Sequence, residues 1–222
     1  MFSKKNCSIK YIMRKSNIIK DSSLFLMIHG YGSNENNLFF MTKDIPKNLF
    51  VVSIRGLFKK EQNAYHWYDI DFSDKKKFIN IEQAKVSIDK ISMLINDIIQ
   101  KYQLNNHNVW LCGFSQGAIL SYAIALKNFK KVKKIIALSG YVENNIFSKL
   151  HKNSNCYDNL DFFISHGKYD NIIPINLARQ SIKILNKIGV SSNNLCYNEY
   201  NSEHTLCETN YKDIINWINN QN

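Results

Sequence analysis

The sequence has no run of about 18 apolar residues, the length that a membrane-spanning helix requires. Residues 1–23 mix charged and apolar side chains throughout, so they lack the apolar segment of a signal peptide. The five cysteines include no C-x-x-C pair and no zinc-ligand spacing, which argues against a disulfide framework or a zinc site. We therefore expect a soluble, cytoplasmic protein in a reducing compartment.

Acidic residues are also few, since 18 Asp and Glu stand against 29 Lys and Arg and leave a formal net charge of +11. A charge of this sign suits an anionic partner such as nucleic acid or a membrane surface. The basic runs at 59–60, 75–77 and 130–134, however, fall in separate expected loops and helix ends, without any nucleic-acid-binding motif. We interpret them as a solvated basic surface, and expect no nucleic-acid partner and no stable insertion into a membrane.

The composition is that of a globular protein. Hydrophobic residues make up 45% and aromatic residues 13% of the 222 positions, which is enough for a core and excludes a disordered or fibrous chain. No internal repeat and no low-complexity linker divides the sequence. A single domain over residues 1–222 is expected, because α/β domains often reach this length.

Short apolar runs alternate with helical patterns from Leu24 onward. Strands buried on both faces are predicted at 23–29, 49–55, 107–112, 133–139, 161–166 and 194–200. Apolar spacings of three and four, and helix-like segments, predict helices at about 81–102, 116–129, 174–188 and 208–218. This alternation predicts an α/β fold with a mostly parallel sheet covered on both faces, in which ligands bind beyond the carboxyl ends of the strands.

Glycine is scarce, with 8 in the chain, yet Gly113 and Gly117 flank Ser115 in the segment GFSQG. Between a predicted strand and a predicted helix, the pattern G-x-S-x-G is typical of a nucleophile elbow, a strained turn that projects the serine from the sheet. The backbone N–H of Gln116 would then begin a helix, where it can donate to a developing oxyanion. The alternative is a serine that only caps the helix.

A nucleophilic serine needs a histidine base, and the histidine needs an acid, which follow it in this order on such a sheet. His204 is the histidine that follows both Ser115 and an acid at the exit end of a strand. That acid is Asp170, although it could instead cap the next helix. Glu203 as the acid, and His204 as an ordinary loop residue, are the weaker alternatives. His166 is interpreted as structural.

Two further segments are expected to line the site. The loop HGYGSNENNLF at 29–39 follows a predicted strand, so the backbone N–H of Tyr31 is the expected second oxyanion donor. Trp67 and Tyr68 lie in the long irregular stretch 56–80 and are candidates for an apolar wall around an acyl chain, with plain core packing as the alternative. Whether 56–80 forms a mobile lid is left open.

With these residues, the sequence resembles the carboxylesterase, lysophospholipase and acyl-protein thioesterase family of α/β-hydrolases, especially its small bacterial members. The resemblance rests on HGYGSNENNLF, HWYDIDF, GFSQGAILSYA, ALSGY, SHGKYDNIIP and the histidine at 204. It implies an α/β-hydrolase domain with little or no cap, no cofactor and no metal, and hydrolysis of carboxylic esters or thioesters. It also implies that Ser115, Asp170 and His204 are catalytic, with Tyr31 and Gln116 as oxyanion donors.

One departure from the family is at the histidine, which commonly has glycine on both sides and here has Glu203 and Thr205. Side chains at these two positions are expected to restrict the loop that carries the histidine and to place a negative charge beside the base. The leading hypothesis is a serine carboxylesterase acting on a small-molecule acyl ester or thioester, with a lysophospholipase or acyl-protein thioesterase as the alternative. An inactive hydrolase fold that only binds a ligand is the non-enzyme alternative, and a homodimer is left open.

Overall fold

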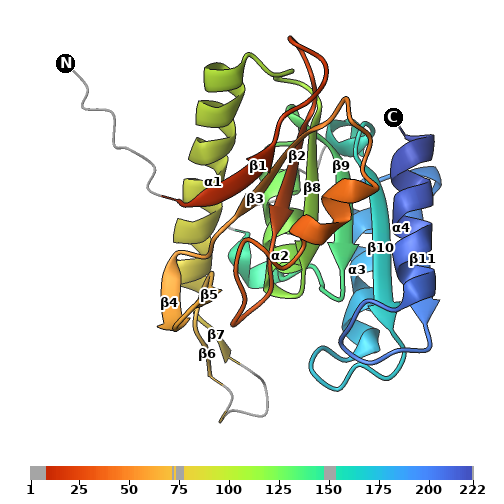
Figure 1. Ribbon diagram of the computed structural model, residues 1–222. Helices are drawn as coiled ribbons and strands as arrows, with labels where there is room; N and C mark the ends of the chain where they lie inside the picture. The colour runs from red at the N-terminus through yellow and green to blue at the C-terminus, as the bar shows by residue number, and fades with distance from the viewer. Residues whose placement is uncertain (1–8, 72, 74–77, 148–153, 222) are drawn as a thin grey trace.

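The computed structural model describes residues 9–71, 73, 78–147 and 154–221. A seven-stranded sheet crosses the molecule in the order β1-β3-β2-β8-β9-β10-β11 (Figure 1). The strands are β1 (Tyr11–Arg14), β2 (Leu24–Ile28), β3 (Phe50–Ile54), β8 (Val109–Phe114), β9 (Val132–Leu138), β10 (Asp161–Gly167) and β11 (Leu195–Tyr200). All neighbouring pairs are parallel except β1 with β3, which is antiparallel. The mostly parallel sheet expected from the sequence is therefore confirmed.

Four α-helices of the described residues cover the two faces of the sheet. They are α1 (Ile81–Tyr102), α2 (Gln116–Lys127), α3 (Ile175–Lys187) and α4 (Glu208–Asn220). Side chains of α1, α2 and α3 belong to one hydrophobic cluster, whereas α4 and the short 3₁₀ helix η1 (Phe39–Lys43) belong to a second cluster. Figure 1 shows α4 and η1 on the side of the sheet nearer the viewer. The described part of the chain also contains the short 3₁₀ helices η2 (Asn144–Ile146), η3 (Ser154–Tyr157) and η4 (Ser192–Asn194).

The apolar runs of the sequence are explained by these two layers. Every residue of β2 and β3 is buried, because helices cover both faces of the central strands. Helix α1 instead buries one stripe, whose members recur at spacings of three and four: Ala84, Ile88, Ile91, Leu94, Ile95, Ile98 and Ile99. Strand β1 at the edge is short and only partly buried, and sequence patterning did not predict it.

The described residues of the stretch 56–80 form more regular structure than the sequence suggested. It contains the antiparallel pair β4 (Phe58–Glu61) with β5 (Ala64–His66), and the pair β6 (Ile70–Asp71) with β7 (Phe78–Ile79). Of the basic runs, 59–60 is exposed on β4, 130–134 leads into β9, and 75–77 lies outside the described residues. Among the helices of the described residues, none has the length and apolar character needed to cross a membrane.

Candidate active site

Ser115 sits in the turn between β8 and α2 with φ 56° and ψ −117°. A positive φ is uncommon for a residue with a side chain, because its Cβ crowds the backbone. Such strained residues concentrate at functional sites, and this one has the strand-to-helix context of a nucleophile elbow. The sequence therefore located the strained residue correctly.

The two flanking glycines serve close approach, not positive φ. A Cβ at Gly113 would overlap the carbonyl of Gly117, and a Cβ at Gly117 would overlap the carbonyl of Ile28. Both overlaps fall below 3.0 Å, a separation that real Cβ atoms essentially never show. The scarce glycines are used here because strand β2, strand β8 and helix α2 meet within backbone contact distance.

Three loops at the carboxyl ends of β8, β10 and β11 bring Ser115, Asp170 and His204 together. The Nε2 atom of His204 lies 3.0 Å from the Oγ of Ser115, and its Nδ1 lies 2.6 Å from the Oδ2 of Asp170. The ring of Phe114 packs beside the imidazole, with 5.0 Å between the ring centroids. These distances form a continuous hydrogen-bonded chain from a buried carboxylate to a serine hydroxyl, which is the geometry of a catalytic triad.

The Asp170 side chain is fully buried. Burial alone would raise its pKa, but hydrogen bonds from His166, from His204 and from the backbone N–H of Ile173 outweigh burial and hold the pKa of this carboxyl well below its usual range. An ionised carboxylate can only accept, so Nδ1 of His204 donates to it, and Nε2 is left to accept the proton of Ser115. Asp170 also caps local backbone, since its Oδ1 accepts from Ile172 and Ile173 at 2.9 and 2.8 Å.

His166 lies beside the loop that carries Asp170. Its ring is fully buried, and its Nε2 lies 2.8 Å from the carbonyl oxygen of Ile173 and 3.2 Å from the Oδ2 of Asp170. It therefore helps to hold the loop that carries the acid. Glu203 and Thr205, the neighbours that replace the family's glycines, both have exposed side chains.

The two expected oxyanion donors lie on the same cavity as Ser115 and His204. Gln116 is the first residue of α2, and the first N–H groups of a helix have no acceptor within it. Tyr31 follows β2 in the loop 29–37, and four residues of this loop line the same cavity: Gly30, Tyr31, Ser33 and Asn37. Both candidate donors therefore line the cavity that contains the serine, and their role as oxyanion donors stays a prediction.

The cavity has a volume of about 680 Å³, within the range of small-molecule sites. Among the residues that the structure describes, no Lys, Arg, Asp or Glu lines it. Its walls are largely apolar and include Ile70, Ile79, Ile119, Tyr141, Ile172 and Leu177. Such walls suit the hydrocarbon part of an acyl group.

The two aromatic residues predicted for the cavity wall have different positions. Tyr68 lines the cavity. Trp67 is fully buried and is not among the lining residues, so its prediction as a wall residue needs correction. The indole is directed to the carbonyl of His29, 2.9 Å from its Nε1, and the ring packs 5.3 Å from the His29 ring. Hydrogen bonding to the loop 29–37 determines the orientation of Trp67.

His29 is a buried residue that sequence reasoning did not single out, although it directly precedes Gly30 at the end of β2. Its Nε2 accepts from the backbone N–H of Gly56 at 2.8 Å, so its Nδ1 carries the proton and donates to the carbonyl of Gly30 at 2.7 Å. Burial is the main reason that the pKa of His29 falls from 6.5 to about 4. The imidazole is therefore neutral at physiological pH and holds the start of the loop.

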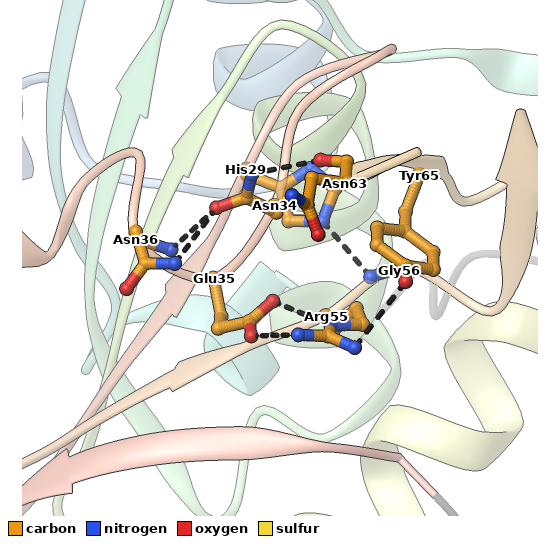
Figure 2. A network of polar contacts seen from close by, with 8 residues as sticks. All are labelled: His29, Asn34, Glu35, Asn36, Arg55, Gly56, Asn63 and Tyr65. Carbon is orange, nitrogen blue, oxygen red and sulfur yellow. Dashed lines mark hydrogen bonds and ion pairs between the residues drawn. The ribbon is translucent and has the colours of Figure 1, made fainter. Parts of the chain in front are cut away.

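The rest of this loop is tied to the segment 55–65, as Figure 2 shows. Glu35 forms a two-pronged ion pair with Arg55, with 2.7 Å between Nε and Oε2, and Arg55 also lies 3.3 Å from the hydroxyl of Tyr65. Asn34 donates to the carbonyl of Asn63 at 2.8 Å. The loop that carries Tyr31 is thus held along its length by contacts with residues 20 to 30 positions later.

The chain is similar along most of its length to proteins of a known family. A family model described as Phospholipase/Carboxylesterase matches residues 12–222. Acyl-protein thioesterase 1 of Yarrowia lipolytica is 23% identical over 211 residues, covering 87% of this chain and 89% of that protein. Acyl-protein thioesterase 1 of Candida albicans is 28% identical over 135 residues, covering 56% of this chain and 58% of that protein.

Solved structures confirm the fold. The carboxylesterase of Bacillus cereus superimposes with a TM-score of 0.81 at 17% identity, covering 97% of this chain and 95% of that chain. Acyl-protein thioesterase 2 of Zea mays superimposes with a TM-score of 0.74 at 15% identity, covering 95% and 98% of the two chains. At these identities the likeness concerns the fold, and the α/β-hydrolase fold expected from the sequence is confirmed.

Proposed function

The chain belongs to the phospholipase/carboxylesterase family, and we propose that it is a serine hydrolase that cleaves carboxylic esters or thioesters through Ser115, His204 and Asp170. The observation that carries the proposal is the chain of hydrogen bonds from the Asp170 carboxylate through His204 to the Ser115 hydroxyl. A serine hydroxyl is a weak nucleophile unless a base takes its proton, and this arrangement supplies the base in the required tautomer.

In the first half of the reaction, the Oγ of Ser115 attacks the acyl carbonyl while its proton passes to Nε2 of His204. The carbonyl oxygen becomes an oxyanion that accepts hydrogen bonds from the N–H groups of Tyr31 and Gln116. The carbon–oxygen or carbon–sulfur bond to the leaving group then breaks, and His204 returns the proton to that group. Asp170 stabilises the imidazolium that exists between these two proton transfers.

In the second half, water takes the place of the leaving group. His204 removes a proton from the water as it attacks the acyl-enzyme, and the same two N–H groups hold the second oxyanion. Collapse of this intermediate releases the carboxylic acid, and the proton on His204 returns to the Oγ of Ser115. The enzyme is regenerated without a cofactor.

The substrate that the cavity supports best is a small-molecule ester with an apolar acyl group, because the walls of the cavity of about 680 Å³ are largely apolar and carry no Lys, Arg, Asp or Glu among the described residues. A simple carboxylesterase is therefore the leading assignment. The relatives named acyl-protein thioesterase favour thioester cleavage as the second candidate. A reducing cytoplasm suits the four cysteines of the described residues, which are all free.

The experiment is hydrolysis of p-nitrophenyl esters from acetate to decanoate, and of acyl thioesters of the same lengths, by the wild type and by Ser115→Ala. Loss of the nucleophile is expected to lower kcat by about 10⁴- to 10⁶-fold. Ser121→Ala is the matched control, because Ser121 is a buried serine on α2 whose hydroxyl donates to the carbonyl of Gly117 in the same helix, at 2.8 Å.

Labelling with an alkyl phosphonofluoridate provides a second measurement, because this reagent attaches to an activated serine and the adduct is visible by mass. Wild type and Ser121→Ala are expected to be labelled, and Ser115→Ala is not. A wild type that neither cleaves any ester or thioester nor reacts with the reagent would favour the inactive binding module. Hydrolysis that survives Ser115→Ala would refute the proposed nucleophile.

A further inference from the structure

Trp67 joins the two segments that carry the proposed oxyanion donors. Its indole N–H donates to the carbonyl oxygen of His29 at 2.9 Å, two residues before Tyr31. Its backbone N–H donates to the side-chain oxygen of Gln116 at 3.0 Å. One residue thus bonds to the loop 29–37 on one side and to the first residue of helix α2 on the other.

The remaining polar groups around Trp67 hold it rigidly in place. The side-chain N–H₂ of Gln116 donates to the carbonyl of Tyr68 at 2.7 Å. The Gln116 amide therefore forms two hydrogen bonds with the Trp67–Tyr68 segment. The hydroxyl of Ser87 on α1 donates to the carbonyl of Trp67 at 2.5 Å. Trp67, Ser87 and Gln116 are all buried, so water does not compete for these bonds.

The hydrogen bond from Trp67 to His29 also fixes the position of Tyr31, because the loop is rigid at His29. The ring of His29 is bonded at both nitrogens, to Gly30 and Gly56, and the Gly56 contact is visible in Figure 2. A shift of the His29 carbonyl would therefore move the peptide of Gly30 and the N–H of Tyr31 with it. Rigid support of this kind is what places hydrogen-bond donors accurately.

We propose that Trp67 is a positioning residue that sets the separation between the N–H of Tyr31 and the N–H of Gln116, and so determines how well the oxyanion is held. This inference rests on the proposed function. Oxyanion donors act in the transition state, where a displacement of about 1 Å can cost on the order of 10²-fold in rate. A role as cavity wall is not favoured, because Trp67 does not line the cavity.

The test compares Trp67→Phe with Trp110→Phe. Trp67→Phe keeps an aromatic ring but removes the donor to His29. Trp110 is a matched control, because it is also buried and its indole N–H also bonds one acceptor, Asn108 at 3.1 Å, but it packs in the hydrophobic cluster that contains α4. Both variants are expected to lower Tm, because each loses volume and one hydrogen bond.

The kinetic constants on p-nitrophenyl butyrate distinguish a residue that positions the oxyanion donors from a residue that only packs in the core. Trp67→Phe is expected to lower kcat by about 10- to 100-fold with KM changed less than about twofold, whereas Trp110→Phe changes both less than about twofold. A trifluoromethyl ketone, which forms a hemiketal oxyanion on the serine, should bind Trp67→Phe weaker by the same factor as the loss in kcat/KM. An unchanged kcat, or a higher KM alone, would overturn the proposal and leave the proposed serine mechanism intact.

Gln116→Met provides a second route if Trp67→Phe does not fold. Methionine keeps the backbone N–H and the length of the side chain but removes both bonds to the 67–68 segment. The same fall in kcat at nearly constant KM is expected. In the double variant Trp67→Phe/Gln116→Met, the two losses in kcat should not add as free energies, because either single change already breaks the connection between the two donors. Fully additive losses would contradict a shared connection. A wild type without esterase activity would overturn the proposed function and this inference together.

Discussion

Replacing His29 with asparagine should change how stability depends on pH, because His29 is a buried histidine whose pKa is lowered in the folded protein. Burial is the main cause, and the imidazole accepts from Gly56 through Nε2, which a proton on that nitrogen would prevent. The hydrogen bond to the Gly30 carbonyl and the charge of Glu35 favour the charged imidazole, Arg55 and His66 oppose it, and each of these is a smaller influence than burial. Asparagine does not titrate and removes this effect.

The magnitude follows from the pKa, which is lowered from 6.5 to about 4. Between these pH values the unfolded chain binds a proton at His29 that the folded protein does not bind, so folding becomes less favourable as the pH falls. A tenfold change in proton affinity corresponds to about 1.4 kcal/mol, so the His29 contribution is about 3 kcal/mol. This stability is present above pH 6.5 and is lost by about pH 4.

Urea unfolding at several pH values between 7 and 4 measures the effect. Both proteins should lose stability from their carboxylates, and the wild type should lose about 3 kcal/mol more than His29→Asn over this interval. At pH 7 the variant should be the less stable protein, since it loses the bonds at Gly30 and Gly56. Equal losses in the two proteins would show that His29 is not held neutral, and would contradict its role in holding the start of the loop 29–37.

Two further predictions concern the elbow and the acid. Gly117→Ala should lower the free energy of unfolding, measured in urea, by at least about 3 kcal/mol, because the new Cβ would overlap the Ile28 carbonyl. Gly32→Ala should cost about 1 kcal/mol, because Gly32 has φ +71° but nothing within 4 Å of the new Cβ. Equal costs for the two variants would contradict the argument that Gly117 is needed for close approach of the backbone. Asp170→Asn should lower kcat for the best ester by about 10³- to 10⁴-fold, because the amide favours the wrong tautomer of His204, and a loss of less than tenfold would exclude Asp170 as the orienting acid.

Much of the candidate site follows from local sequence. The fully apolar strands β2 and β3 are recognisable because burial on both faces leaves no polar position. The turn at Ser115 is recognisable because the positions two residues before and after it must be glycine, since a Cβ at Gly113 or Gly117 would overlap neighbouring backbone. Asp170 and His204 could be chosen because parallel strands place their exit loops at one edge of the sheet, which makes chain order informative.

Two adjacent residues, Trp67 and Tyr68, show where local sequence is insufficient. The pattern did not distinguish them, and a shared role as cavity wall was predicted for both. In the structure Tyr68 faces the cavity and Trp67 faces His29, because partners 38 and 49 positions from Trp67 satisfy its N–H groups. No periodicity within the segment encodes that choice.

The sequence by itself determined the layered α/β fold and the three residues of the hydrogen-bonded relay, because each depends on neighbours in the chain or on the order of strands. Tertiary structure alone decided the edge strand β1, the neutral state of His29 and the contacts that connect Tyr31 with Gln116 through Trp67. These depend on long-range hydrogen bonds in a water-excluded interior, where a buried polar group must find a partner wherever the fold brings one.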